Sequence, residues 1–174
     1  ACHETLPGHH LQRALQKEQT GLPTIQRSYL IGCTAFTEGW ALYAERLANE
    51  HGYFKTPQDK FFYLESEYYR AMRLVLDTGI HALKWTRSEA MAYAQKNYGT
   101  SWSGEIDRYI VMPGQACAYK IGQLKILELR ERARQALGDR FDLKEFHWVV
   151  LRNGAIPLSV LEDEVQRYIE SKQS

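Results

Sequence analysis

The chain has 174 residues, of which 44% are hydrophobic and 25% are charged, and its formal net charge is +1. This balance is ordinary for a globular domain with one core, and it gives no reason to expect nucleic acid or an anionic membrane as a partner. No stretch approaches 18 consecutive apolar residues, so the sequence predicts no transmembrane helix.

The cysteines indicate whether disulfides are present, and the first residues indicate whether the sequence is part of a longer protein. Cys2, Cys33 and Cys117 are widely spaced and odd in number, which predicts free, mostly buried thiols rather than a disulfide framework. The sequence opens directly on Ala-Cys-His-Glu, a segment rich in candidate ligands. We therefore expect a fragment of a longer protein, and the missing signal peptide assigns neither an envelope nor a cytoplasmic location.

Helical patterns dominate the first half of the chain. Residues 10–19 are strong helix formers that end at Gly21-Leu22-Pro23. Residues 36–50 carry large apolar side chains at helical spacing. Thr56-Pro57 then begins a long aromatic-rich segment that runs to residue 83, whose apolar positions recur every three and four residues. These patterns predict three helices.

The second half continues in the same way. Thr86 and Glu89 form a predicted capping box ahead of residues 90–99. Pro113-Gly114 interrupts residues 108–122, which lead into a charged helix over 126–139. Asp142 is the expected cap of a helix over 143–154, and Pro157 begins the last helix, 158–171. Without any alternating strand pair or internal repeat, the sequence predicts a single all-α domain over residues 1–174.

The first motif, residues 3–10, concentrates three of the six histidines. Zinc peptidases often use His-Glu-x-x-His, with the two histidines one helical turn apart and the glutamate as general base. On an ideal helix His9 would lie about 240° round from His3, and His10 would lie about 10.5 Å further along the axis. Pro7 must distort a helix and Gly8 gives it freedom, so a bulge can bring His9 beside His3.

The second motif, residues 36–45, offers the third ligand that a catalytic zinc site requires. Glu38 lies in an otherwise apolar helix, where a buried carboxylate needs a cation or strong donors. Gly39 allows another backbone or a ligand to approach closely. Glu45, seven residues later on nearly the same face, is a plausible partner for a ligating histidine.

Four segments carry a family resemblance across nearly the whole chain: HETLPGHHLQ, FTEGWALYAERL, RYIVMPGQACAYKIG and FHWVVLRNGAIPLSVLE. In this order they resemble the bacterial family catalogued as domain of unknown function 885, which itself looks like a relative of the gluzincin metallopeptidases. Members of that family are longer, so the resemblance implies that this chain is their C-terminal part. Glu38-Gly39-Trp40-Ala41 is similar to the Glu-Gly-Phe-Ala segment of aminopeptidase N relatives, in which the glutamate ligates zinc. Gly8-His9 is similar to a Gly-His found in several gluzincins, which favours His9 over His10 as the second ligand.

The segments after residue 100 offer candidates for the rest of an active site. Tyr109, Tyr119 and His147 are candidate donors to an oxyanion, and the two tyrosines lie where the chain resembles carboxypeptidase Taq near its active site. Arg108 could bind a substrate carboxylate through its planar guanidinium group.

A further group lies on the long predicted helix. Arg73, Asp77 and His81 are spaced four apart, which favours ion pairs that support the helix over a substrate-anchoring network.

The sequence thus leads to one hypothesis and one alternative. The hypothesis is zinc-dependent hydrolysis of a peptide bond, with Zn²⁺ held by His3, His9 and Glu38, and with Glu4 as the general base on the bound water. The alternative is a metal-binding or pseudopeptidase module without catalysis, since the same ligands would be present. The sequence gives no basis for an oligomeric state.

Overall fold

The structure is a computed structural model that describes residues 2–28 and 32–173. Within these residues the fold is all-α, as the sequence predicts. The helices are α1 (His9–Glu18), α2 (Thr24–Arg27), α3 (Thr34–Glu50), α4 (Pro57–His81), α5 (Arg87–Tyr98), α6 (Ser103–Val111), α7 (Gln115–Leu137), α8 (Leu143–Leu151) and α9 (Leu158–Gln173), with a 3-10 turn η1 (Gly138–Arg140) after α7.

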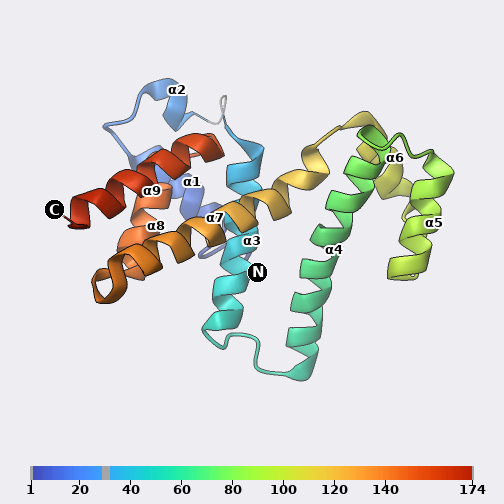
Figure 1. The fold of residues 1–174 in the computed structure, drawn as a ribbon, viewed down its shortest axis with the longest axis horizontal. Helices are drawn as coiled ribbons and strands as arrows, with labels where there is room; N and C mark the ends of the chain where they lie inside the picture. The colour runs from blue at the N-terminus through green and yellow to red at the C-terminus, as the bar shows by residue number, and fades with distance from the viewer. Residues whose placement is uncertain (1, 29–31, 174) are drawn as a thin grey trace.

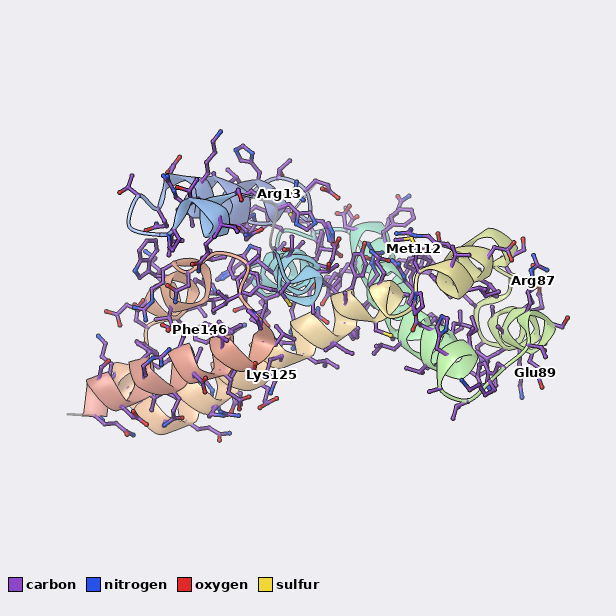
Figure 2. All side chains as sticks on the ribbon, turned by 90° about the horizontal axis from the view of Figure 1, so that it is seen from above. Arg13, Arg87, Glu89, Met112, Lys125 and Phe146 are labelled. Carbon is purple, nitrogen blue, oxygen red and sulfur yellow. The ribbon has the colours of Figure 1, made fainter. Side chains whose placement is uncertain are left out.

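Two helices cross at the centre of the molecule. α3 and α7 pack against each other more extensively than any other pair, and α7 runs from the edge of the α4–α6 group to the opposite end of the fold (Figure 1). α4 to α6 lie at one end of α7, and α1, α8 and α9 lie at the other (Figure 1). Figure 2 shows this elongated form from above, with Arg87 and Glu89 of α5 at one end and Phe146 of α8 in the opposite half.

The hydrophobic core is correspondingly divided into two clusters of buried side chains. The larger cluster joins α3, α7, α8 and α9, and it includes Phe36, Ile126, Phe146 and Leu161. The smaller cluster joins α4, α5, α6 and the first turn of α7, around Met72, Leu76, Ala90, Ala94, Ile106, Tyr109 and Ala116. α7 therefore carries side chains of both clusters and links the two halves.

The caps that the sequence predicts are present. Thr86 and Glu89 form the capping box of α5, with the Glu89 amide donating to the Thr86 hydroxyl at 3.2 Å. Asp142 accepts a hydrogen bond from the Glu145 amide at the start of α8. Thr56 and Asp59 form a second capping box at α4, a feature that the sequence analysis did not identify. Side-chain acceptors satisfy amides at these three helix N-termini that would otherwise lack partners.

Two sequence expectations need correction in detail. Residues 3–8 form a turn rather than a bulged helix, and α1 begins only at His9. The short helices α2 and α6 were not predicted as separate elements, since α2 has only four residues and Pro113-Gly114 separates α6 from α7. In the described part of the chain, no helix combines the length and apolar character needed to cross a membrane.

Candidate metal centre

The turn that precedes α1 folds the first motif back on itself. The amide of His9 donates to the carbonyl oxygen of His3 at 2.8 Å, and the amide of His10 donates to that of Glu4 at 3.1 Å. Gly8 permits this because a Cβ there would meet the His3 carbonyl oxygen at 1.9 Å. The indole of Trp40 in α3 donates to the carbonyl of Pro7 at 2.8 Å and fixes the turn against that helix.

Two histidines and one glutamate converge at this point. Nε2 of His9 lies 3.3 Å from Oε2 of Glu38, and Nε2 of His3 lies 3.7 Å from the same oxygen. The two imidazole rings meet edge to face, with centroids 4.9 Å apart. Zinc binds nitrogen and carboxylate oxygen at about 2.0–2.1 Å, so two tetrahedral ligands are separated by about 3.3 Å. The observed separations therefore fit a shared ion between these three side chains.

His9 rather than His10 takes part in this arrangement. The His9 side chain is nearly buried between the turn and α3, while His10 is exposed on the outer side of α1. His10 instead lines an open depression with Arg13 and Lys17. The extra residues between the two histidines are absorbed by the turn, which brings His9 back beside His3.

Glu4 occupies a different environment from Glu38. Its side chain is 75% exposed, against 19% for Glu38, and its Oε1 lies 4.0 Å from Nε2 of His3. Ligand atoms of His3, Glu4 and His9 lie within 4.8 Å of one another. Glu4 is thus beside the potential ion position on its solvent side, while the Glu38 carboxylate lies on the protein side.

Glu45 is the partner of His3 that the sequence predicts. Its Oε1 lies 2.6 Å from Nδ1 of His3, and its Oε2 accepts a hydrogen bond from the Ser66 hydroxyl of α4 at 2.9 Å. Arg70 donates in turn to the Ser66 oxygen at 3.4 Å. Because Nδ1 of His3 is held by Glu45, Nε2 is left to face Glu38 and a possible metal ion.

The histidines and glutamates of the cluster shift one another's pKa values. Burial lowers the pKa of His3, but hydrogen bonds with Glu38 and Glu45 outweigh burial and raise it to about 9. Burial likewise raises the pKa of Glu38, while His3 and His9 lower it to about 2. Two buried carboxylates around one imidazole make a site that favours positive charge.

The close crossing of α3 and α7 brings a tyrosine to this cluster. A Cβ on Gly39 would lie 2.4 Å from Cα of Gly122, and one on Gly122 would lie 1.8 Å from the Ala35 carbonyl oxygen. The approach predicted at Gly39 is therefore that of the α7 backbone. One turn before Gly122, the ring of Tyr119 stacks on His3 with centroids 6.3 Å apart. Of the three oxyanion donors predicted from the sequence, Tyr119 is the one whose ring contacts a candidate metal ligand, His3.

The other two candidate donors lie elsewhere. Tyr109 is buried in the smaller core cluster, next to Arg73, and burial together with the neighbouring Tyr69 raises the pKa of its hydroxyl. His147 hydrogen-bonds through Nε2 to the Tyr43 hydroxyl at 2.8 Å and packs edge to face on Trp40. Its contacts in the described chain are thus with the core side of α3, not with the histidine cluster.

Arg108 is exposed on α6 and donates to Oε1 of Gln115 at 3.2 Å, the same oxygen that accepts from Arg73 at 3.0 Å. It therefore lies beside Arg73 rather than beside His3.

The predicted helix-supporting pairs on α4 are not formed. Asp77 accepts two hydrogen bonds from the Gly114 amide, at 3.1 and 3.0 Å, and so holds the start of α7. His81 lies 2.8 Å from the carbonyl oxygen of Tyr109 and donates to it. The prediction of ion pairs spaced four apart was wrong because both side chains turn toward other elements. Arg73 is left without either of them as a hydrogen-bonding partner.

The three cysteines are free, as predicted. Only Cys117 is fully buried, and burial and the nearby Asp77 raise its thiol pKa to about 11. Cys2 adjoins His3 in sequence, but it lines an apolar cavity with Leu6 and Leu47 instead of joining the ligand cluster.

Sequence reasoning missed Ser66, Tyr69 and Arg70. Ser66 and Arg70 reach the cluster from α4 through Glu45 and Tyr119, with Arg70 5.4 Å from the Tyr119 ring centroid, and Tyr69 lies next to Arg70. The available signal was the segment Tyr69-Arg70-Ala71-Met72-Arg73, which places two arginines three residues apart on one helix among aromatic and apolar residues.

Two solved structures are similar to this chain over nearly its whole length. A protein from Colwellia psychrerythraea, described as a candidate lipoprotein, is 48% identical, with a TM-score of 0.91. Another, from Shewanella oneidensis, also described as a candidate lipoprotein and of unknown function, is 29% identical, with a TM-score of 0.82. The Colwellia match covers 98% of this chain and the Shewanella match covers 93%. This chain spans only 29% of the length of the first protein and 30% of the length of the second.

Comparison with functionally curated proteins finds no match. A family described as "Bacterial protein of unknown function (DUF885)" matches residues 1–165, which is nearly the whole chain. This match agrees with the motifs in the sequence, and the chain therefore belongs to the DUF885 family.

Proposed function

We propose that the protein is a zinc-dependent peptidase of gluzincin type, with Zn²⁺ bound by His3, His9 and Glu38. The observation that best supports this is the spacing of the two Nε2 atoms from one Glu38 oxygen, at 3.3 and 3.7 Å. Those distances are close to the separation of two ligands on one tetrahedral zinc. Two imidazoles and one carboxylate also match the ligand types of catalytic zinc sites.

A bound zinc ion would supply a Lewis acid for the scissile carbonyl and lower the pKa of a bound water. Glu4 is on the open side of the cluster, where its carboxylate can take the proton of the attacking water and pass it to the leaving amine. Tyr119, stacked on His3, is the candidate to donate to the oxyanion. Glu45 keeps His3 oriented through Nδ1.

The test is Glu4→Gln in the full natural protein. We expect zinc content close to one equivalent in both forms, and a fall in peptide hydrolysis on the order of 10²- to 10⁴-fold in the variant, since general acid-base catalysis is worth that much. Glu128→Gln, an exposed change on α7, serves as the control. Activity that persists in Glu4→Gln would overturn the mechanism.

One observation favours a second function, a metal site without catalysis. Ligand atoms of His3, Glu4 and His9 come within 4.8 Å of one another, so Glu4 could close the site as a fourth ligand. In that case Glu4→Gln weakens zinc binding, and the wild-type protein hydrolyses no peptide. Zinc affinity of the variant therefore separates the two functions.

A further inference from the structure

We propose that Arg70 and Arg73 of α4 form a subsite for a carboxylate group of the substrate, beside the metal centre. This inference rests on the proposed peptidase function for its substrate class, but its evidence comes from different residues. The subsite consists of the two guanidinium groups and the rings of Tyr69, Tyr109 and Tyr119.

The two cations share the same aromatic neighbours. Cζ of Arg73 lies 4.5 Å from the Tyr119 ring centroid and 5.6 Å from that of Tyr69. Cζ of Arg70 lies 5.4 and 5.1 Å from the same two centroids. Two like charges around shared rings repel each other, and the ring faces offset only part of that cost.

Neither cation contacts a carboxylate directly in the described chain, and Arg70 is linked to Glu45 only through the Ser66 hydroxyl. Arg73 is only 3% exposed, and its one hydrogen bond goes to the neutral amide of Gln115. Arg70 bonds only to the Ser66 hydroxyl, and no described carboxylate lies within 4.0 Å of either group. The Nε atoms of both arginines are buried without a hydrogen-bond partner. Because buried charges are normally paired, this arrangement is suited to receive an anion.

An open cavity lies beside Arg70. It has a volume of about 340 Å³, and it is lined by Ser66, Tyr69 and Arg70 together with Glu65 and Tyr98. The Glu65 carboxylate accepts from the Tyr98 hydroxyl at 2.7 Å, so one of its oxygens is already engaged. Arg70 is half-buried at the wall and can contact a ligand directly. Arg73 is buried, does not line the cavity, and adds its charge at longer range next to the same Tyr69 ring.

The subsite is within reach of the metal centre. The His3 and Tyr119 ring centroids are 6.3 Å apart, and Cζ of Arg73 is 4.5 Å from the latter, so Arg73 lies at most about 11 Å from His3. An extended peptide covers that distance in about three residues. The planar guanidinium of Arg70 suits a carboxylate, which it can bind in bidentate fashion. The carboxylate would therefore belong to a residue close to the scissile bond.

The experiment is a calorimetric titration of the metal-free full natural protein, so that no probe can bind a metal ion. Four probes are used: N-acetyl-Ala-Ala with a free terminal carboxylate, its amide, N-acetyl-Ala-Glu-amide and N-acetyl-Ala-Gln-amide. We expect at least tenfold tighter binding of one carboxylate probe than of its amide partner. A difference within the Ala-Ala pair would show that the subsite binds a terminal carboxylate, and a difference within the Glu/Gln pair would show that it binds a side-chain carboxylate.

The variants are Arg70→Ala and Arg73→Met, with Arg87→Met on α5 as the control (Figure 2). We expect both subsite variants to lose the preference for the carboxylate and the control to keep it. Arg73→Met should also keep or raise thermal stability, because replacing a buried unpaired cation by an apolar side chain removes a desolvation cost. A merely structural Arg73 would instead give a less stable variant with unchanged preference.

Equal binding of carboxylate and amide probes by the wild type overturns the subsite, as does an unchanged preference in both variants. Failure of the peptidase function would look different. In that case no peptide is hydrolysed, while the carboxylate preference and its loss in the variants remain.

Discussion

At the scale of single residues, the candidate centre depends on what each carboxylate faces. Glu38 and Glu45 are both largely buried and both contact His3, one at each ring nitrogen. Glu4, close in sequence to the same histidine, is mostly exposed. Three glutamates of identical chemistry thus have three different roles open to them, and burial and partner separate those roles.

Glu45→Gln tests the role of the residue behind His3. A neutral amide cannot hold the Nδ1 proton as strongly, so His3 loses orientation and basicity as a ligand. We expect zinc affinity to fall roughly 10- to 100-fold with little change in fold. Competition with a chelator measures the affinity, and Glu131→Gln, on the exposed face of α7, is the control. Unchanged affinity in Glu45→Gln would contradict the assignment.

His147 predicts a pH dependence of stability. Burial, and then Arg130, lower its pKa to about 4 from an unfolded value of about 6.5. Between these values the unfolded chain binds more protons at this residue, so the contribution of His147 to stability is present above pH 6.5 and is lost as the pH falls to 4. The shift corresponds to roughly 3 kcal/mol.

The measurement is urea unfolding from pH 4 to 8 for wild type and for His147→Gln. Other titrating groups act in both proteins, so the difference between the two curves isolates His147. We expect the variant to lose less stability than the wild type over this range. Parallel curves would show that His147 titrates normally in the folded protein.

At the scale of elements, the crossing of α3 and α7 determines the distance between the ligands and Tyr119. The contact has no room for a methyl group at Gly39 or Gly122, since each Cβ would collide with backbone atoms of the opposite helix. Glu38 precedes one of these glycines, and Tyr119 lies one turn before the other. The same contact therefore serves packing and site geometry.

Gly39→Ala and Gly122→Ala are each expected to lower the free energy of unfolding by roughly 3 kcal/mol, because the helices must move apart. The separation should also weaken zinc binding. Gly104→Ala in α6, where a Cβ would meet no atom within 4 Å, is the matched control, and it should stabilise by up to about 1 kcal/mol. Chemical denaturation measures all three, and equal effects at the three positions would refute the close-contact argument.

At the scale of the whole molecule, the candidate site lies where the two halves meet. α3 belongs with the larger cluster and holds the turn of residues 2–8 through the Trp40 indole, while α4 carries Ser66, Arg70 and Arg73 from the side of the smaller cluster. α7 passes between them and contributes Tyr119 (Figure 1). Neither half holds all of these residues, so the site depends on how α7 joins the two clusters.

The sequence by itself determined the local structure. Caps at Thr86 and Asp142, the Pro113-Gly114 break and helical spacing of apolar residues all act within a few residues, and the helices predicted after residue 9 are present. The motif around Glu38 also pointed to its partners, because a carboxylate in an apolar helix needs nearby positive charge or donors.

Only the tertiary structure decided which distant side chains meet. The hydrogen bonds that close the turn place His9 rather than His10 beside His3. The fold also places Tyr119 next to His3, while His147 bonds to Tyr43 instead. It also engages Asp77 with the Gly114 amide and His81 with the Tyr109 carbonyl, so in the described chain the buried Arg73 has no direct contact with a carboxylate. These outcomes depend on where α3, α4 and α7 cross, and helix crossings are set by side-chain packing between elements rather than by spacing along one of them.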